Sequence, residues 1–155
     1  TDEKLKKSPL FRIARKNPYK GGVIPPESAD FVSDDNLFNY QAKVIRELAE
    51  EESCIIIGRC ANYIYRDDKD CVSVYLHADR EIRCERLQKR DQISEKEALK
   101  NIQEVDEKRA AFQEQCTSTR WGDGNEYDLC IDTGKIGIEN AVEMILEYIR
   151  FENIF

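Results

Sequence analysis

Residues 52–62 read Glu-Ser-Cys-Ile-Ile-Ile-Gly-Arg-Cys-Ala-Asn, a short apolar run followed by a glycine and an arginine. Three consecutive isoleucines are β-branched and favour a strand, and an apolar run without alternation is typical of a strand covered on both faces. We therefore predict a strand over Cys54–Ile57. Gly58 allows a tight turn where the strand ends, so Arg59 is expected at the carboxyl edge of the sheet, where open α/β sheets bind ligands.

Arg59 has two interpretations that this stretch alone supports about equally. Its planar guanidinium is suited to holding an anion with two parallel hydrogen bonds. Alternatively, it makes a structural ion pair with a nearby carboxylate. The neighbouring Cys60 is not assigned as a nucleophile, because that chemistry needs a partner base and none lies nearby in the sequence.

Composition limits the classes of function. The chain has 155 residues, which suits a single domain spanning 1–155, and a net charge of −7. This charge argues against broad electrostatic binding to nucleic acid or to an anionic membrane surface. No apolar run approaches the roughly 20 residues that cross a bilayer. An anionic ligand would have to be a small molecule held by a few placed cations.

The cysteines and the single histidine do not predict a metal site. The six cysteines form no C-x-x-C pair, and His77 is the only histidine. Unpaired cysteines within apolar runs behave as small hydrophobes, so we expect a reducing, cytoplasmic setting. His77 follows an apolar run, where packing or capping is a commoner role for histidine than catalysis.

The remaining chain alternates between helical and extended patterns. Residues 1–32 are irregular, with four prolines and a Gly-Gly pair. We predict further strands over Val72–Leu76 and Asp128–Ile131, parallel to the first in one sheet. Helices are expected over Leu37–Glu50, Arg80–Arg90 after an Asp79 cap, Ser94 to about Glu114 with a Ser94/Glu97 capping box, and Gly137–Arg150. This alternation predicts an α/β fold with a parallel sheet flanked by helices.

Four cations are candidates for binding a polyanion: Arg59, Lys108, Arg109 and Arg120. Asp106 lies three residues before Arg109 on a predicted helix, so the two can pair. Such a pair is usually a surface feature, but Asp106 could instead orient Arg109 towards a phosphate. Because the cations come from separate segments, residues 91–125 are interpreted as a lid that closes over the ligand.

Four motifs together resemble the cytidylate kinase-like family. The sequence Ile-Gly-Arg-Cys-Ala-Asn-Tyr over 57–63 is similar to the Gly-Arg-Cys-Ala-Asp-Tyr signature of that family. The others are Leu37-Phe38 with Gln41, the run Asp-Glu-Lys-Arg-Ala-Ala over 106–111, and Trp-Gly-Asp over 121–123 followed by residues 127–137. They occur in the family's order and cover roughly residues 34–147.

The resemblance implies a fold, a reaction and a set of site residues. It implies the three-layer P-loop kinase fold of the nucleoside monophosphate kinases, and phosphoryl transfer from ATP to CMP or dCMP with Mg²⁺. Arg59, with Gly58, would contact the acceptor phosphate, whereas Asp106 and Arg109 would bind the phosphate in transfer. Lys108 is a weaker match to the lid motif, and Arg120 is added from its position in the lid.

The chain also departs from the family pattern. Cys60 stands where classical cytidylate kinases carry Asp, and Asn62 replaces the Asp common in the cytidylate kinase-like branch, so the resemblance leaves the preferred nucleobase open. No glycine-rich phosphate loop of the G-x-x-x-x-G-K-[ST] type occurs. We expect the strand, loop and helix that carry it to precede Thr1. The alternative is a non-catalytic module that binds a nucleotide or anion on the same fold.

Overall fold

The computed structural model describes residues 34–152, so the predicted irregular segment 1–32 lies outside the described residues. The chain falls into two units, Thr1–Ile64 and Tyr65–Phe155.

The described part of the first unit is a helix, a turn and a short second helix. Helix α3 spans Asp34–Glu51 and confirms the amphipathic helix expected over Leu37–Glu50; Phe38 and Ala42 are buried on it. Helix α4 spans Ala61–Ile64 and packs against α3. The Arg46 guanidinium donates a hydrogen bond to the Ile64 carbonyl at 3.0 Å, which fixes the end of α4 to the middle of α3.

The predicted strand over Cys54–Ile57 is wrong. These residues have no strand conformation, and the side chains of Ile55 and Ile57 are 94% and 88% exposed. A strand exists only through hydrogen bonds to a neighbouring strand, whereas β-branched composition expresses a local preference. In residues 34–152 the sheet consists of two other strands, and neither pairs with this segment.

The second unit contains this sheet. Strands β1 (Val74–His77) and β2 (Leu129–Asp132) are parallel, with Val74 opposite Leu129 and His77 opposite Asp132. Side-chain hydrogen bonds link the two strands at both ends. At the start, the Ser73 hydroxyl donates to the Asp128 carboxylate at 2.6 Å; at the other end, the Thr133 hydroxyl donates to the His77 carbonyl at 3.0 Å. The two later predicted strands and their parallel direction are confirmed.

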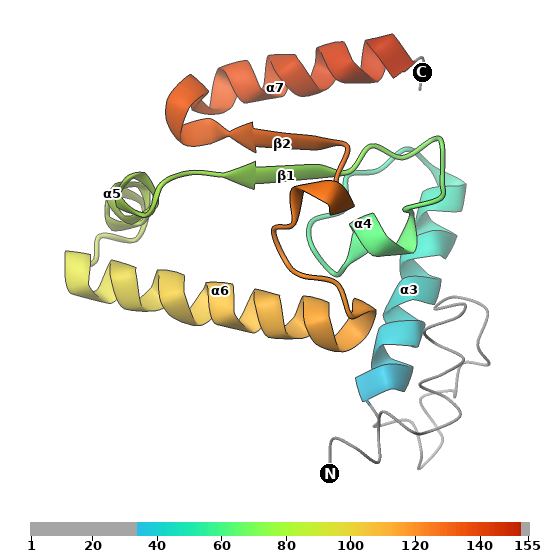
Figure 1. Ribbon diagram of the computed structural model, residues 1–155, viewed down its shortest axis with the longest axis horizontal. Coiled ribbons are helices and arrows are strands. Elements are labelled where there is room, and N and C mark those ends of the chain that lie inside the picture. The colour runs from blue at the N-terminus through green and yellow to red at the C-terminus, as the bar shows by residue number, and fades with distance from the viewer. Residues whose placement is uncertain (1–33, 153–155) are drawn as a thin grey trace. The chain divides into compact units, whose positions relative to one another are not determined.

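Helix α7 (Thr133–Glu152) covers one face of the sheet, and helix α6 (Glu95–Thr117) lies on the other side (Figure 1). The kink in α7 falls at Gly137, whose φ of 83° and ψ of 169° suit glycine. The helix predicted from Gly137 onward is therefore confirmed and is preceded by one further turn. The result is an α/β arrangement with helices on both faces of a parallel pair, whereas the full three-layer P-loop fold stays a prediction.

Helix α5 (Arg80–Asp91) and α6 form a hairpin with its own small core. Cys84, Ala98 and Ile102 are buried between them, with Leu87, Ile93 and Leu99 packed around. The predicted capping box is present, since the Ser94 hydroxyl accepts from the Glu97 backbone N–H and the Glu97 carboxylate accepts from the Ser94 N–H. Asp79 is the N-cap of α5, but its side chain makes no capping hydrogen bond. Over residues 34–152, none of the helices has the length and apolar character needed to cross a membrane.

Candidate functional site

In the first unit, Arg59 lies on an unusual left-handed turn. Gly58, Arg59 and Cys60 have φ angles of 70°, 57° and 55°. The turn is held by the Ala61 N–H donating to the Gly58 carbonyl at 3.1 Å, and by the Tyr63 and Ile64 N–H groups donating to the Cys60 carbonyl. Each non-glycine residue in this conformation costs about 1–2 kcal/mol, and such strain collects at functional sites. The tight turn predicted at Gly58 is confirmed.

The strained turn presents the Arg59 side chain to solvent. Arg59 is exposed and Cys60 is buried. Among residues 34–152, no ion pair or hydrogen bond to the Arg59 guanidinium is formed, so the structural ion pair weighed for it has no support there. An exposed guanidinium on a fixed turn is a group that an anion can reach.

The second unit contains a cluster of five side chains that we call the Asp106 cluster: Tyr75, Arg83, Asp106, Arg109 and Trp121. At its centre Arg83 of α5 donates to both oxygens of Asp106 on α6, each at 2.7 Å. The two side chains are 32% and 28% exposed. The hydrogen bond to Asp106 raises the pKa of Arg83 above its usual value, although burial opposes this. Bidentate pairs of this kind are the strongest that arginine and carboxylate form.

The predicted pairing of Asp106 with Arg109 is not found. Asp106 instead bonds to Arg83, which lies 23 residues away, because the α5–α6 hairpin brings the planar fork of Arg83 onto the carboxylate. The Arg109 guanidinium lies 5.9 Å from the centre of the Trp121 ring. Within the described part of the chain Arg109 makes no ion pair, and it is exposed.

Aromatic side chains support this arrangement from the sheet. The Tyr75 ring contacts Trp121 edge-on, with centroids 5.9 Å apart, and the Tyr127 ring at 5.1 Å. Gly122 lies so close that an added Cβ would meet the Tyr75 hydroxyl oxygen at 2.9 Å. Burial and, next, the charge of Asp106 raise the pKa of the Tyr75 phenol. Trp121 is thereby held as a platform beneath Arg109.

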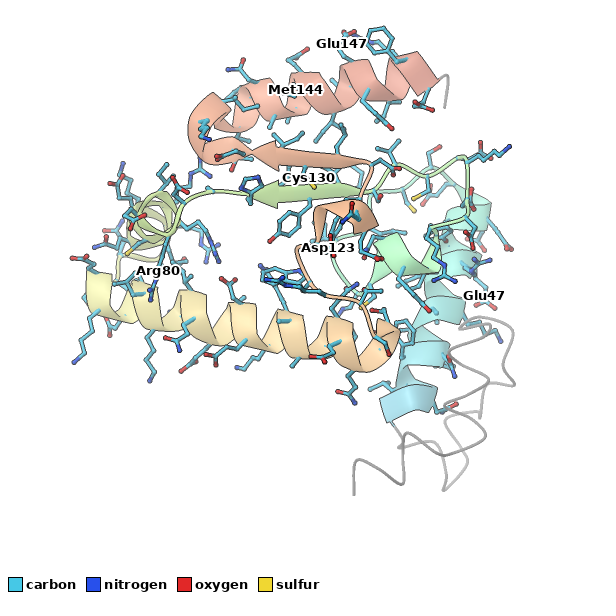
Figure 2. The ribbon with its side chains drawn as sticks, viewed as in Figure 1. Glu47, Arg80, Asp123, Cys130, Met144 and Glu147 are labelled. Carbon is cyan, nitrogen blue, oxygen red and sulfur yellow. The ribbon has the colours of Figure 1, made fainter. Side chains whose placement is uncertain are left out.

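Figure 2 shows where the loop that carries Asp123 lies relative to the sheet. Asp123, which accepts from the Asn125 N–H at 3.0 Å at the start of the short helix η2 (Gly124–Glu126), lies on the side of the sheet opposite Met144 of α7 (Figure 2). The loop that carries Trp121 therefore belongs to the α6 side, as Tyr75 does. The edge-on contact of Trp121 with Tyr75 anchors this loop to the sheet.

The carboxyl edge of the two strands carries a second polar network. Arg86 of α5 donates to the Thr133 hydroxyl at 2.9 Å and to the Thr133 carbonyl at 2.7 Å. The Asp132 carboxylate accepts from the Gly134 and Lys135 N–H groups. Burial raises the pKa of Asp132, but these bonds and the Lys135 charge together bring it below its usual value. His77 stacks on Tyr75 with centroids 6.0 Å apart, which fits the packing role expected for it.

The structure brings only some predicted site residues together. Asp106 and Arg109 share the Asp106 cluster. Lys108 lies about 200° around α6 from Asp106 at 100° per residue and is exposed. Arg120 is exposed, and its backbone carbonyl accepts from the Asp123 N–H at 3.2 Å. Arg59 and Gly58 belong to the first unit.

Sequence reasoning missed Arg83, Arg86 and Tyr75. A signal was present for the arginines, because Arg80, Arg83 and Arg86 recur at three-residue spacing on α5 and so lie near one another on the helix surface. Tyr75 gave no such signal, since a tyrosine inside a strand is ordinary. No group of three or more potential metal-ligating His, Cys, Asp or Glu side chains occurs in residues 34–152.

Comparisons with known proteins agree with these features. Residues 2–135 match the cytidylate kinase-like family. A cytidylate kinase of Pyrobaculum islandicum is 30% identical over 103 residues, covering 66% of this chain and 55% of that protein. A cytidylate kinase of Saccharolobus islandicus is 26% identical over 107 residues, covering 69% and 56%. This chain thus spans about half the length of the curated relatives that it matches.

A solved structure gives the same picture for the fold. An uncharacterized protein from Eubacterium ventriosum superposes with a TM-score of 0.70 at 31% identity, covering 96% of this chain and 79% of that one. The family match extends through the Arg59 turn and the whole Asp106 cluster and ends within the first turn of α7. The chain belongs to the cytidylate kinase-like family.

Proposed function

We propose that this protein is a nucleoside monophosphate kinase that transfers a phosphoryl group from ATP to CMP or dCMP. The observation that carries the proposal is Arg109, an exposed guanidinium in the family's lid motif that no carboxylate of the described residues neutralises. Phosphoryl transfer spreads negative charge over the moving group, and cations placed against that charge supply most of the catalysis. The names of the curated relatives support the same reaction.

Each site residue has a role in this proposal. Arg59, presented on its strained turn, holds the phosphate of the acceptor nucleotide. Arg109 contacts the phosphoryl group in transfer. Asp106 takes part indirectly, through the two hydrogen bonds that it accepts from Arg83. Lys108 and Arg120 are exposed cations that add to the positive field of the lid.

Mg²⁺ is part of the reaction that the family resemblance implies. The described residues contain no group of three or more potential metal-ligating His, Cys, Asp or Glu side chains. Mg²⁺ is commonly bound by phosphates with only one or two carboxylates, and it enters this proposal with the nucleotide.

The direct test is a coupled assay for ADP release. The protein made from the complete gene should phosphorylate CMP and dCMP at about 1–100 s⁻¹ and prefer them to UMP, AMP and GMP. A polypeptide of residues 1–155 alone should show negligible turnover, because its sequence offers no glycine-rich loop for the donor phosphates. Robust turnover by that polypeptide would contradict this account of the donor site. If the complete protein phosphorylates none of the five nucleotides but binds them, the non-catalytic module is the better description.

Substitutions of Arg59 separate its charge from its backbone strain. Arg59→Ala and Arg59→Gly should both weaken CMP binding about ten- to hundred-fold, because a hydrogen bond to a charged group contributes about 1.5–3 kcal/mol. The Gly variant should exceed the Ala variant in free energy of unfolding by about 1 kcal/mol, since only alanine keeps a Cβ in the left-handed region. Calorimetric titration and urea unfolding measure the two effects.

Arg59→Lys is the matched control for charge. It keeps the cation without the two-pronged geometry, so it should recover only part of the CMP affinity. Unchanged CMP affinity in the Ala variant would refute the acceptor site. Equal stability of the Ala and Gly variants would show that the turn stores no strain.

A further inference from the structure

Asp106 lies within reach of two arginines, and only one of them occupies it. Arg109 follows it by three residues on α6, a spacing at which helical side chains pair. Arg83 reaches it from α5 and takes both of its oxygens. We propose that Arg83 is a positioning residue that occupies Asp106 and thereby keeps the charge of Arg109 available to a phosphate. This inference rests on the proposed function.

Geometry explains why Arg83 prevails. Its two terminal nitrogens each lie 2.7 Å from a different oxygen of Asp106, so both oxygens already accept a charged hydrogen bond. The pair is only about one-third exposed, where screening by water is reduced. A pair between Asp106 and Arg109 within one helix would be a weaker, more solvent-screened contact. The hairpin therefore settles the competition in favour of Arg83.

Trp121 completes the arrangement. With Asp106 occupied, Arg109 rests over the Trp121 ring, at 5.9 Å from its centre. Contact with an aromatic face orients a guanidinium without cancelling its charge, and its N–H groups stay free to donate to an anion. Trp121 is itself fixed by the edge-on contact with Tyr75. Arg109 is thus restrained but not neutralised.

The proposal predicts a specific failure when Arg83 is lost. In Arg83→Gln, Asp106 keeps its charge and turns to Arg109, so Arg109 is sequestered for much of the time. An exposed pair of this type has an equilibrium constant of about 1–5, so affinity for a phosphate should fall about two- to six-fold. Arg109→Ala should cost about ten-fold or more. Because both act through Arg109, Arg83→Gln/Arg109→Ala should bind no more weakly than Arg109→Ala.

Pyrophosphate titrated by calorimetry into the full-length protein is the test, because it reads anion binding without turnover. Arg83→Gln/Asp106→Asn should recover most of the lost affinity, since asparagine cannot capture Arg109 through charge. Arg90→Gln is the matched control, because Arg90 lies on the same helix in an exposed pair with Asp91 and should leave affinity unchanged. Arg83→Lys, which keeps the charge and most of the packing, should give an intermediate loss that also vanishes without Arg109.

Trp121 supplies a second readout, because it is the only tryptophan of the chain. Without ligand, its fluorescence should change in the same direction in Arg83→Gln and Arg109→Ala and by less in Arg83→Gln, since that substitution draws the guanidinium from the ring for only part of the time. Additive effects of the two substitutions on affinity, unchanged emission in Arg83→Gln, or no saturable pyrophosphate binding by the wild type would each overturn the inference. If the protein does not phosphorylate CMP while the effects of the two substitutions on binding remain non-additive, the proposed kinase activity is refuted and the inference about Arg83 stands.

Discussion

Replacing Arg109 with Ala is expected to lower turnover of CMP about a thousand-fold, the low end of the effect seen for arginines that stabilise a phosphoryl group in transfer. The reason lies in the Asp106 cluster, where Arg109 is exposed, held over Trp121 and free of ion pairs within residues 34–152. Its full charge is therefore available to the transition state. The coupled ADP-release assay on the full-length protein measures the effect.

Two further variants make this expectation specific. Arg109→Lys should recover part of the rate, because the charge remains while the planar donors are lost. Arg90→Ala removes an exposed arginine that pairs with Asp91 on α5, and it should change turnover less than about two-fold. Turnover by Arg109→Ala within about three-fold of the wild type would remove Arg109 from the reaction and leave Arg59 as the main candidate.

The largest expected effect on stability comes from Ile131. It is 3% exposed in β2, and alternation along the strand directs it to the face covered by α7, opposite to Cys130. Ile131→Ala should lower the free energy of unfolding by about 2–5 kcal/mol, through lost burial and the cavity left behind. Urea denaturation followed by circular dichroism measures the change.

Two control substitutions test whether the loss of stability follows the buried side-chain volume that is removed. Ile131→Val removes one methylene and should cost about 0.5–1.5 kcal/mol. Ile138→Ala makes the full truncation on α7 at a position that is 59% exposed, and it should cost less than about 1 kcal/mol. Equal losses for Ile131→Ala and Ile138→Ala would show that the α7 face of the sheet is not a core.

The sequence predicted features that depend on neighbours along the chain. The Ser94/Glu97 capping box was predictable because both partners lie within one helical turn. The left-handed turn at Gly58 was predictable from the residue type, although its extension through Arg59 and Cys60 was not. The helices over Leu37–Glu50 and Gly137–Arg150 followed from their apolar periodicity.

Features that depend on distant partners escaped prediction. The segment Cys54–Ile57 has strand composition but lacks a neighbouring strand among residues 34–152, and composition says nothing about pairing. Asp106 was expected to pair along its own helix, yet the hairpin brought Arg83 to it. Nearness in sequence placed Asp106 and Arg109 on one helix, but tertiary contacts decided which charge was neutralised.

The side-chain hydrogen bonds at the two ends of the sheet fix the register of β1 against β2, which two such short strands leave ambiguous. Sliding one strand by one residue would turn Ile131 away from α7, so burial alone rejects that error. Sliding by two residues would keep every side chain on its own face, and two four-residue strands offer little else to distinguish it. Such a slip would separate Ser73 from Asp128 and Thr133 from His77, and it would also pull Thr133 away from Arg86. These polar contacts therefore select one alignment among those that hydrophobicity cannot tell apart.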